Sequence, residues 1–256
     1  MPRFNLQNAT IKMRDGLAGT ATVDNAAGIA DGATTADITG VALNNEFTDV
    51  VPVGARFTVA GEALPAGETE PIVHVVTATD GVTDGATPST NITFSPGIEA
   101  GSAIADGASI TVLPQELEVR IGTGNLTYTE ARNLEYELDR GRLDSVVEGD
   151  ETPVAVTLAY VYEFVRTGTN EVISPVDAVK GINAASGWVS AGSDPCEPYA
   201  VDLIVCYEVP CSTVAVQTEV TTLREFRFDQ LQYDLSAAQI SVTGRSNRTE
   251  AVQERI

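Results

Sequence analysis

The sequence has few of the residues on which most catalytic and metal sites depend. Its 256 residues include a single histidine, His74, one tryptophan and three cysteines, and no two cysteines form a CxxC pair. A Cys/His zinc site lacks its usual ligands, and no serine motif accompanies His74 as a Ser/His/Asp triad requires. We therefore expect no catalytic residue, no metal site and no cofactor, and we expect His74 to be a half-buried structural side chain.

Positive charge is also scarce. The chain has 36 acidic and 15 basic residues, which gives a formal net charge of −21. This excludes nucleic-acid binding by phosphate neutralisation, which needs a basic patch. Only Lys12 and Lys180 are lysines, so nearly all positive charge is carried by arginine. Arginine suits ion pairs at interfaces, although codon usage explains the same imbalance equally well.

Long apolar runs are absent as well. No stretch of about 18 apolar residues occurs, and the first 16 residues have no apolar core, so we expect neither a transmembrane helix nor a secretory signal. Cys196, Cys206 and Cys211 lie in one short stretch, and their odd number leaves at least one thiol free. A bridge between Cys196 and Cys211 remains open, but reduced thiols are the preferred interpretation.

Residues 16–113 differ in composition from the rest of the chain. They are rich in Ala, Gly, Thr and Asp, with twelve acidic residues against one basic residue, Arg56. Short β-prone runs stand between Gly, Pro and Asp-Gly turn signals, at 55–61, 71–79, 90–95 and 108–114. A connection of this length must fold on its own. We predict a small acidic β-barrel or sandwich, inserted into a β core made of residues 1–15 and 114–256.

The remaining chain predicts a mainly β core, a sandwich or half-barrel with one or two short helices. Apolar residues alternate at strand spacing in the runs 9–13, 116–121, 153–166, 199–208, 224–235 and 239–243. Both faces of 153–166 are apolar or small, so we expect it to be the covered, central strand of the main sheet. Residues 244–256 are expected to form a polar tail.

Three further features complete the expected core. Ser174 followed by Pro175 and Asp177 predicts the start of a short helix that ends at Gly181. The glycines of residues 121–125 predict a hairpin turn. Trp188 is expected to be a packing anchor in a polar loop.

The segment 136–150, YELDRGRLDSVVEGD, is the most charged part of the chain. Alternating acids and arginines favour an exposed or interfacial loop over an acid/base site. The candidate subunit-interface residues are Asp139, Arg140, Arg142, Asp144, Glu148 and Asp150. We expect the arginines of one copy to pair with these acids of a neighbouring copy, because arginine–carboxylate pairs are directional. The alternative is that the pairs form within one loop and only shape it.

Two stretches carry a resemblance to a known family. LEVRIGTGNLTYTEARNLEYELDRGRLDSVVEGDETPVAVTLAYVYEF and QLQYDLSAAQISVTGRSNRTEA resemble the tail tube proteins of tailed bacteriophages. The resemblance covers the first strand and residues 115–256. It implies hexameric rings that stack into a helical tube through which DNA leaves the capsid during genome ejection. Residues 16–113 lie outside it and look like a small β module found in various phage structural proteins, so their placement does not carry over.

The resemblance also implies partners and a location. The expected partners are further copies of the chain and other tail proteins, such as the terminator, the tape measure and the baseplate or tip. DNA would pass without specific binding, because an acidic lumen repels phosphate. The expected location is the virion tail, assembled in the bacterial cytoplasm without a membrane.

Two other functions remain open. One is a tail terminator or head–tail connector that forms a single ring. The other is a surface-binding β module, although residues 16–113 offer only Phe47, Phe57 and Phe94 for stacking on sugars. An enzyme is the least favoured interpretation.

Overall fold

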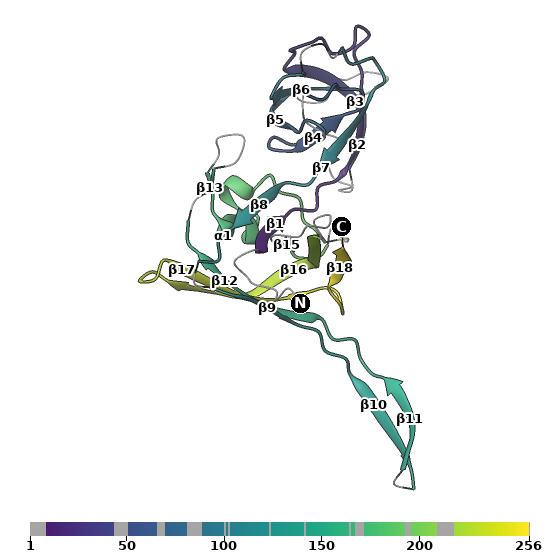
Figure 1. Ribbon diagram of the computed structural model, residues 1–256, viewed down its shortest axis with the longest axis vertical. Helices are drawn as coiled ribbons and strands as arrows, with labels where there is room; N and C mark the ends of the chain where they lie inside the picture. Colours follow the sequence, from purple (N-terminus) through teal and green to yellow (C-terminus); the bar gives the residue numbers. More distant parts are fainter. Residues whose placement is uncertain are drawn as a thin grey trace, which may run out of the picture.

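The computed structural model describes residues 9–43, 51–65, 70–80, 89–99, 101, 103–122, 124–140, 142–163, 165–166, 172–192, 196–208 and 218–255. Nearly all of its regular structure is β-strand, which confirms the predicted mainly β class with a small inserted barrel. Three parts follow one another along the longest axis of the molecule: a closed barrel, a central core and a two-stranded hairpin (Figure 1).

The core is built on an antiparallel sheet of eight strands. Their order is β8–β1–β15–β16–β17–β12–β9, and β18 pairs with the first part of β16. The strands are β1 (Ala9–Arg14), β8 (Glu116–Val119), β9 (Leu126–Thr129), β12 (Val154–Val161), β15 (Val201–Glu208), β16 (Thr218–Asp234), β17 (Gln239–Ser246) and β18 (Val252–Arg255). Val161 donates its backbone N–H to the carbonyl of Arg120, which follows β8, at 2.9 Å. The sheet therefore curls toward a half-barrel.

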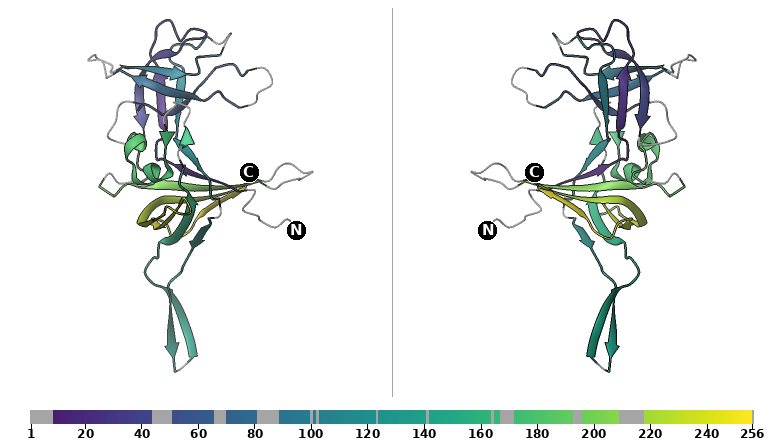
Figure 2. Two further views of the ribbon diagram at one scale, coloured as in Figure 1. Left: turned by 90° about the vertical axis from the view of Figure 1, so that its left-hand side faces the viewer. Right: turned by 90° about the vertical axis from the view of Figure 1, so that its right-hand side faces the viewer.

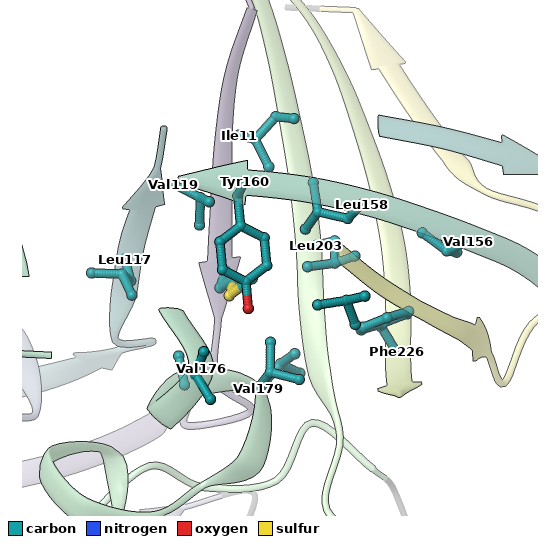
Figure 3. Packing of buried hydrophobic residues seen from close by; sticks show 14 of the residues in the cluster. Ile11, Leu117, Val119, Val156, Leu158, Tyr160, Val176, Val179, Leu203 and Phe226 are labelled. Atoms are coloured by element: carbon teal, nitrogen blue, oxygen red, sulfur yellow. The ribbon is translucent and has the colours of Figure 1, made fainter. Parts of the chain in front are cut away.

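Alternate side chains of these strands fill the inside of the curved sheet. Ile11, Leu158 and Leu203 come from three different strands and are almost fully buried. Figure 3 shows the Tyr160 ring among them, with its hydroxyl directed toward helix α1 (Pro175–Lys180). This hydroxyl has no hydrogen-bond partner among the described residues, and burial raises the pKa of Tyr160. One polar atom thus remains in an otherwise apolar core.

Helix α1 begins and ends as the sequence predicts. The Ser174 hydroxyl accepts a hydrogen bond from the Val176 N–H, and the Asp177 carboxylate accepts one from the Ser174 N–H, both at 3.2 Å. Gly181 ends the helix with φ 61°, a left-handed conformation that favours glycine. The helix is followed by the short 3₁₀ helix η2 (Asn183–Ala185) and by Trp188, which is buried in the same core, as expected.

The inserted part is a closed six-stranded barrel in the order β2–β3–β6–β5–β4–β7. Its strands are β2 (Gly19–Val23), β3 (Thr35–Leu43), β4 (Arg56–Val59), β5 (His74–Thr79), β6 (Ser89–Ser95) and β7 (Ser109–Leu113). The last four match predicted runs, whereas β2 and β3 were missed because Gly, Thr and Asp dilute their alternation. The barrel has its own hydrophobic core, separate from that of the main sheet.

His74 is fully buried inside the barrel, so the half-buried placement expected from the sequence is wrong. Its ring lies 5.2 Å from the rings of both Phe57 and Phe94. Both ring nitrogens are nevertheless engaged: Nδ1 lies 2.8 Å from the Pro96 carbonyl oxygen, and Nε2 lies 2.7 Å from a carboxylate oxygen of Glu62. Burial is tolerated because each polar atom has a partner.

The barrel is joined to the core through the carboxylate of Asp15. This buried group accepts backbone hydrogen bonds from Leu17 at 3.2 Å, Gln115 at 2.7 Å and Val189 at 3.3 Å. The three donors belong to the linker into the barrel, the linker out of it and a core loop. Burial raises the pKa of Asp15 to about 7, against the N–H donors and nearby Arg14, which lower it.

Two expectations about the main sheet are wrong. β12 is not covered on both faces, because Ala155 and Thr157 are exposed while their neighbours are buried, and it lies next to the edge strand β9 rather than at the centre. The prediction failed because the side chains on the outer face are small, and small residues are also common on buried faces. A turn does form at residues 121–124, where the Gly124 N–H donates to the Ile121 carbonyl at 2.8 Å, but it does not connect a hairpin, because β8 and β9 pair with different strands.

The C-terminal segment also differs from its expectation. β17 continues to Ser246 and β18 follows within the supposed tail. A further two-stranded ribbon, β13 (Val165–Arg166) with β14 (Val172–Ile173), was not expected. Cys211 and the first eight residues lie outside the described residues, so the interpretation of the cysteines as reduced thiols stays a prediction.

The buried hydroxyl of Tyr160 yields a stability prediction. Tyr160→Phe removes a polar atom that has no partner among the described residues, so we expect unchanged stability or a gain of about 1–3 kcal/mol. Tyr160→Ala, which leaves a cavity, should lose about 3–5 kcal/mol. Urea unfolding followed by fluorescence measures both. A clear loss of stability in Tyr160→Phe would show that the hydroxyl is hydrogen-bonded in solution.

The raised pKa of Asp15 yields a pH prediction. Between about pH 4 and pH 7 the folded protein keeps Asp15 protonated while the unfolded chain ionises it. The folded state then binds more protons, so this group's stabilising contribution is full below pH 4 and is lost as the pH rises toward 7. We expect the unfolding free energy of wild type, measured relative to that of Asp15→Asn, to fall as the pH rises over this range, by about 1.4 kcal/mol per pH unit. A difference independent of pH would contradict the prediction.

Candidate assembly surface

A β-hairpin projects from the core at the end opposite to the barrel. It consists of β10 (Leu134–Asp139) and β11 (Arg142–Glu148), which pair with each other and with no other described strand. Figures 1 and 2 show the pair standing clear of the core in every view. The charged segment expected to be a loop is therefore mostly strand. Leu134, Tyr136 and Leu138 alternate with acids, which is a pattern typical of a strand. The prediction missed it because the many charged residues favoured a loop.

The hairpin has two chemically different faces, because opposed residues in an antiparallel pair point to the same side. Tyr136 is opposite Val146, and Leu138 is opposite Leu143. The apolar face carries Leu134, Tyr136, Leu138, Leu143 and Val146, which are 44, 57, 64, 70 and 55% exposed, with Glu148 opposite Leu134 at its base. The other face, called here the acidic face, carries Glu135, Glu137 and Asp139, opposite Val147, Ser145 and Arg142.

Such a hairpin is unfavourable in an isolated molecule. A two-stranded ribbon is at best marginally stable in water, and it needs a third strand or a packed face for support. Here the apolar face is exposed along its whole length rather than folded onto the core. A continuous exposed apolar surface of this kind usually marks an interaction site. The hairpin is therefore the candidate contact surface of the molecule.

The base of the hairpin is fixed to the core. The Gly149 N–H donates to the Asn133 carbonyl at 2.9 Å, which closes the base of the ribbon. Arg132 forms an ion pair with Glu250, and the hydrogen bond to Glu250 raises the pKa of Arg132. The Ala251 N–H donates to a carboxylate oxygen of Glu130 at 2.8 Å. These contacts set the direction in which the hairpin leaves the core.

The predicted interface residues fall into two groups. Asp139, Arg140 and Arg142 lie together at the tip, where the Arg140 Nε is 4.0 Å from a carboxylate oxygen of Asp139 and both side chains are largely exposed. The Arg142 side chain has no hydrogen bond or ion pair among the described residues. Its charge is thus open to a partner from outside the chain.

The other predicted residues lie away from the tip. Glu148 ends β11 opposite Leu134, and Asp150 follows the hairpin. Both therefore lie at its base, at the other end from Arg140 and Arg142. Asp144 belongs to β11, but its side chain lies outside the described residues. Within the described part of the hairpin, the 4.0 Å contact at the tip is the only Arg–acid pair.

The parts of the chain that the structure describes contain no group of three His, Cys, Asp or Glu side chains arranged to hold a metal ion. No helix in them is long and apolar enough to cross a membrane. The chain matches no protein-family model, and no curated protein and no solved structure is significantly similar to it. The hairpin geometry is therefore the main structural guide to function.

The exposed apolar face yields a prediction for self-association. Replacing both Leu138 and Leu143 with Ser should change the stability of the isolated molecule by no more than about 0.5 kcal/mol each, because both side chains are mostly exposed. The same change should weaken self-association measured by sedimentation velocity. Val53→Ser with Leu64→Ser, two exposed apolar side chains of the barrel part, is the matched control. Equal association in both double variants would exclude the apolar face as a contact surface.

Proposed function

We propose that the protein is a structural subunit that assembles with copies of itself into rings and that these rings stack into the tail tube of a bacteriophage. The observation that carries the proposal is the projecting hairpin, whose apolar face is not covered by any of the residues that the structure describes. The phage context and the sixfold number come from the sequence resemblance. The hairpin supports the more general part, that the protein functions as an assembly.

The open edges of the core sheet support lateral joining. Among the described strands, β9 pairs with β12 on one side only, and β18 pairs only with β16. Unpaired strand edges promote association, and joining them between neighbours removes them. The outer face of β12, with exposed Ala155 and Thr157, is small and smooth enough to lie against another subunit. Lateral joining of this kind closes a ring.

The ends of the molecule support stacking. The hairpin leaves the core at one end and the barrel occupies the other (Figure 1). A contact between two different surfaces repeats from one copy to the next, and it grows into an open polymer when rotation does not close it. With a net charge of −21, the lumen of such a polymer would repel DNA and keep it mobile.

A single-ring terminator or connector is the second candidate. It is favoured if the barrel, which adds bulk at one end of the core, blocks addition of the next ring. Negative-stain electron microscopy of the purified protein at rising concentration separates the two. We expect long tubes whose length grows with concentration. Rings of constant height at every concentration would favour the terminator or connector and overturn the tube.

The arginines of the hairpin tip provide a second test of the proposal. Arg140→Glu with Arg142→Glu reverses two exposed charges whose only ion pair among the described residues is the 4.0 Å contact between Arg140 and Asp139. We expect a folded protein, checked by circular dichroism, that forms few or no tubes. Tubes of normal length would remove these arginines from the contact between subunits.

A further inference from the structure

A cleft of about 530 Å³ lies where the barrel joins the core. It is bordered by both linkers, by the loop at residues 191–192, by β15 and β16, and by the segment after β17. Its charged lining consists of Arg14, Asp15, Asp202, Arg224, Glu225 and Arg248. Three arginines in one cleft are notable in a chain with only 15 basic residues among 256.

A β-bulge builds the inner wall of this cleft. The register between β15 and β16 shifts so that Arg224 and Glu225 both stand opposite Asp202. Glu225 has φ 55°, a conformation that costs about 1–3 kcal/mol for residues other than glycine and often occurs at functional sites. Bulges redirect side chains. Here Glu225 is buried while Arg224 is exposed at the cleft.

The acids of the cleft are already paired within the chain. Arg14 lies 3.3 Å from Asp202, and Arg248 lies 2.8 Å from Glu225. The Glu225 N–H also donates to the Asp202 carboxylate at 2.9 Å. Arg224, in contrast, has no side-chain hydrogen bond or ion pair among the described residues. The cleft therefore presents one guanidinium, that of Arg224, without an ion-pair partner among the described residues.

The acidic face of the hairpin has the complementary charge. Glu137 accepts a hydrogen bond from the Ser145 hydroxyl at 2.9 Å, whereas Glu135 has no side-chain partner among the described residues. The chain as a whole repels such a face, because it carries a net charge of −21. The Arg224 guanidinium, which has no ion-pair partner among the described residues, attracts it, and charge complementarity of this kind determines which surfaces meet.

The barrel and the hairpin lie at opposite ends of the core (Figures 1 and 2). The lining residues place the cleft at the barrel end, so one copy cannot join its own two surfaces. We infer that the cleft receives the acidic face of the hairpin from a second copy, with Arg224 pairing with Glu135 or Glu137. This inference rests on the proposed function, and it names the receiving site for stacking. The apolar face of the same hairpin then lies against the neighbouring barrel or core.

Charge reversal tests the inference. Arg224→Glu should raise the protein concentration needed for tube formation about tenfold or more, as loss of one close interfacial ion pair does. Arg245→Glu is the matched control, since Arg245 is an exposed arginine on β17 that pairs with Asp229 and does not line the cleft. Adding Glu135→Arg and Glu137→Arg to Arg224→Glu should restore assembly. Circular dichroism and thermal melting verify that each variant is folded.

The outcomes separate this inference from the function on which it rests. Tubes from wild type and from Arg224→Glu at the same concentration would overturn the inference and leave the proposed function standing. Failure of the charge swap to restore assembly would also overturn it. Absence of any self-association in wild type would overturn both. A tenfold loss in Arg224→Glu, normal assembly in Arg245→Glu and recovery in the swap would establish the contact.

Discussion

The carboxylate of Asp15 is the contact on which the arrangement of the molecule depends. Each of its hydrogen bonds comes from a different segment, so the single side chain connects both linkers of the barrel to a core loop. Gly16 reinforces the connection, because a Cβ atom there would lie 2.2 Å from the Ser190 carbonyl oxygen. Two separate hydrophobic cores are thereby held as one body, and the cleft between them has a defined shape.

The hairpin is a two-stranded ribbon with an exposed apolar face. Its strands follow the alternation that a sheet needs, yet they have no third strand and no core to cover them. In a monomeric protein such a ribbon would be removed or folded back. Here its base is held by contacts to the segment before β18, while its tip is left without support. If copies assemble as proposed, burial of the apolar face supplies the stabilisation that the isolated ribbon lacks.

Much of the fold follows from the sequence, and the failures have physical causes. Helix α1 could be placed because Ser174, Pro175 and Gly181 act through local backbone chemistry alone. The position of β12 could not, since only tertiary contacts decide whether Ala155 and Thr157 face solvent. Arg140 and Arg142 could be proposed as contact residues because their segment is rich in charged residues. Arg224 was not, because its role depends on a bulge and on distant partners that no local pattern reveals.

The barrel also has a simple relation to the chain that carries it. β1 and β8 are antiparallel neighbours, with Arg14 opposite Glu116, so the barrel occupies the place of a hairpin turn. Its entry and exit are therefore about one strand spacing apart, roughly 4.8 Å. The core would accept any folded unit whose ends lie equally close, or a short turn. If the chain forms a tube, this junction is a regular attachment point at which a foreign domain can be displayed once per subunit.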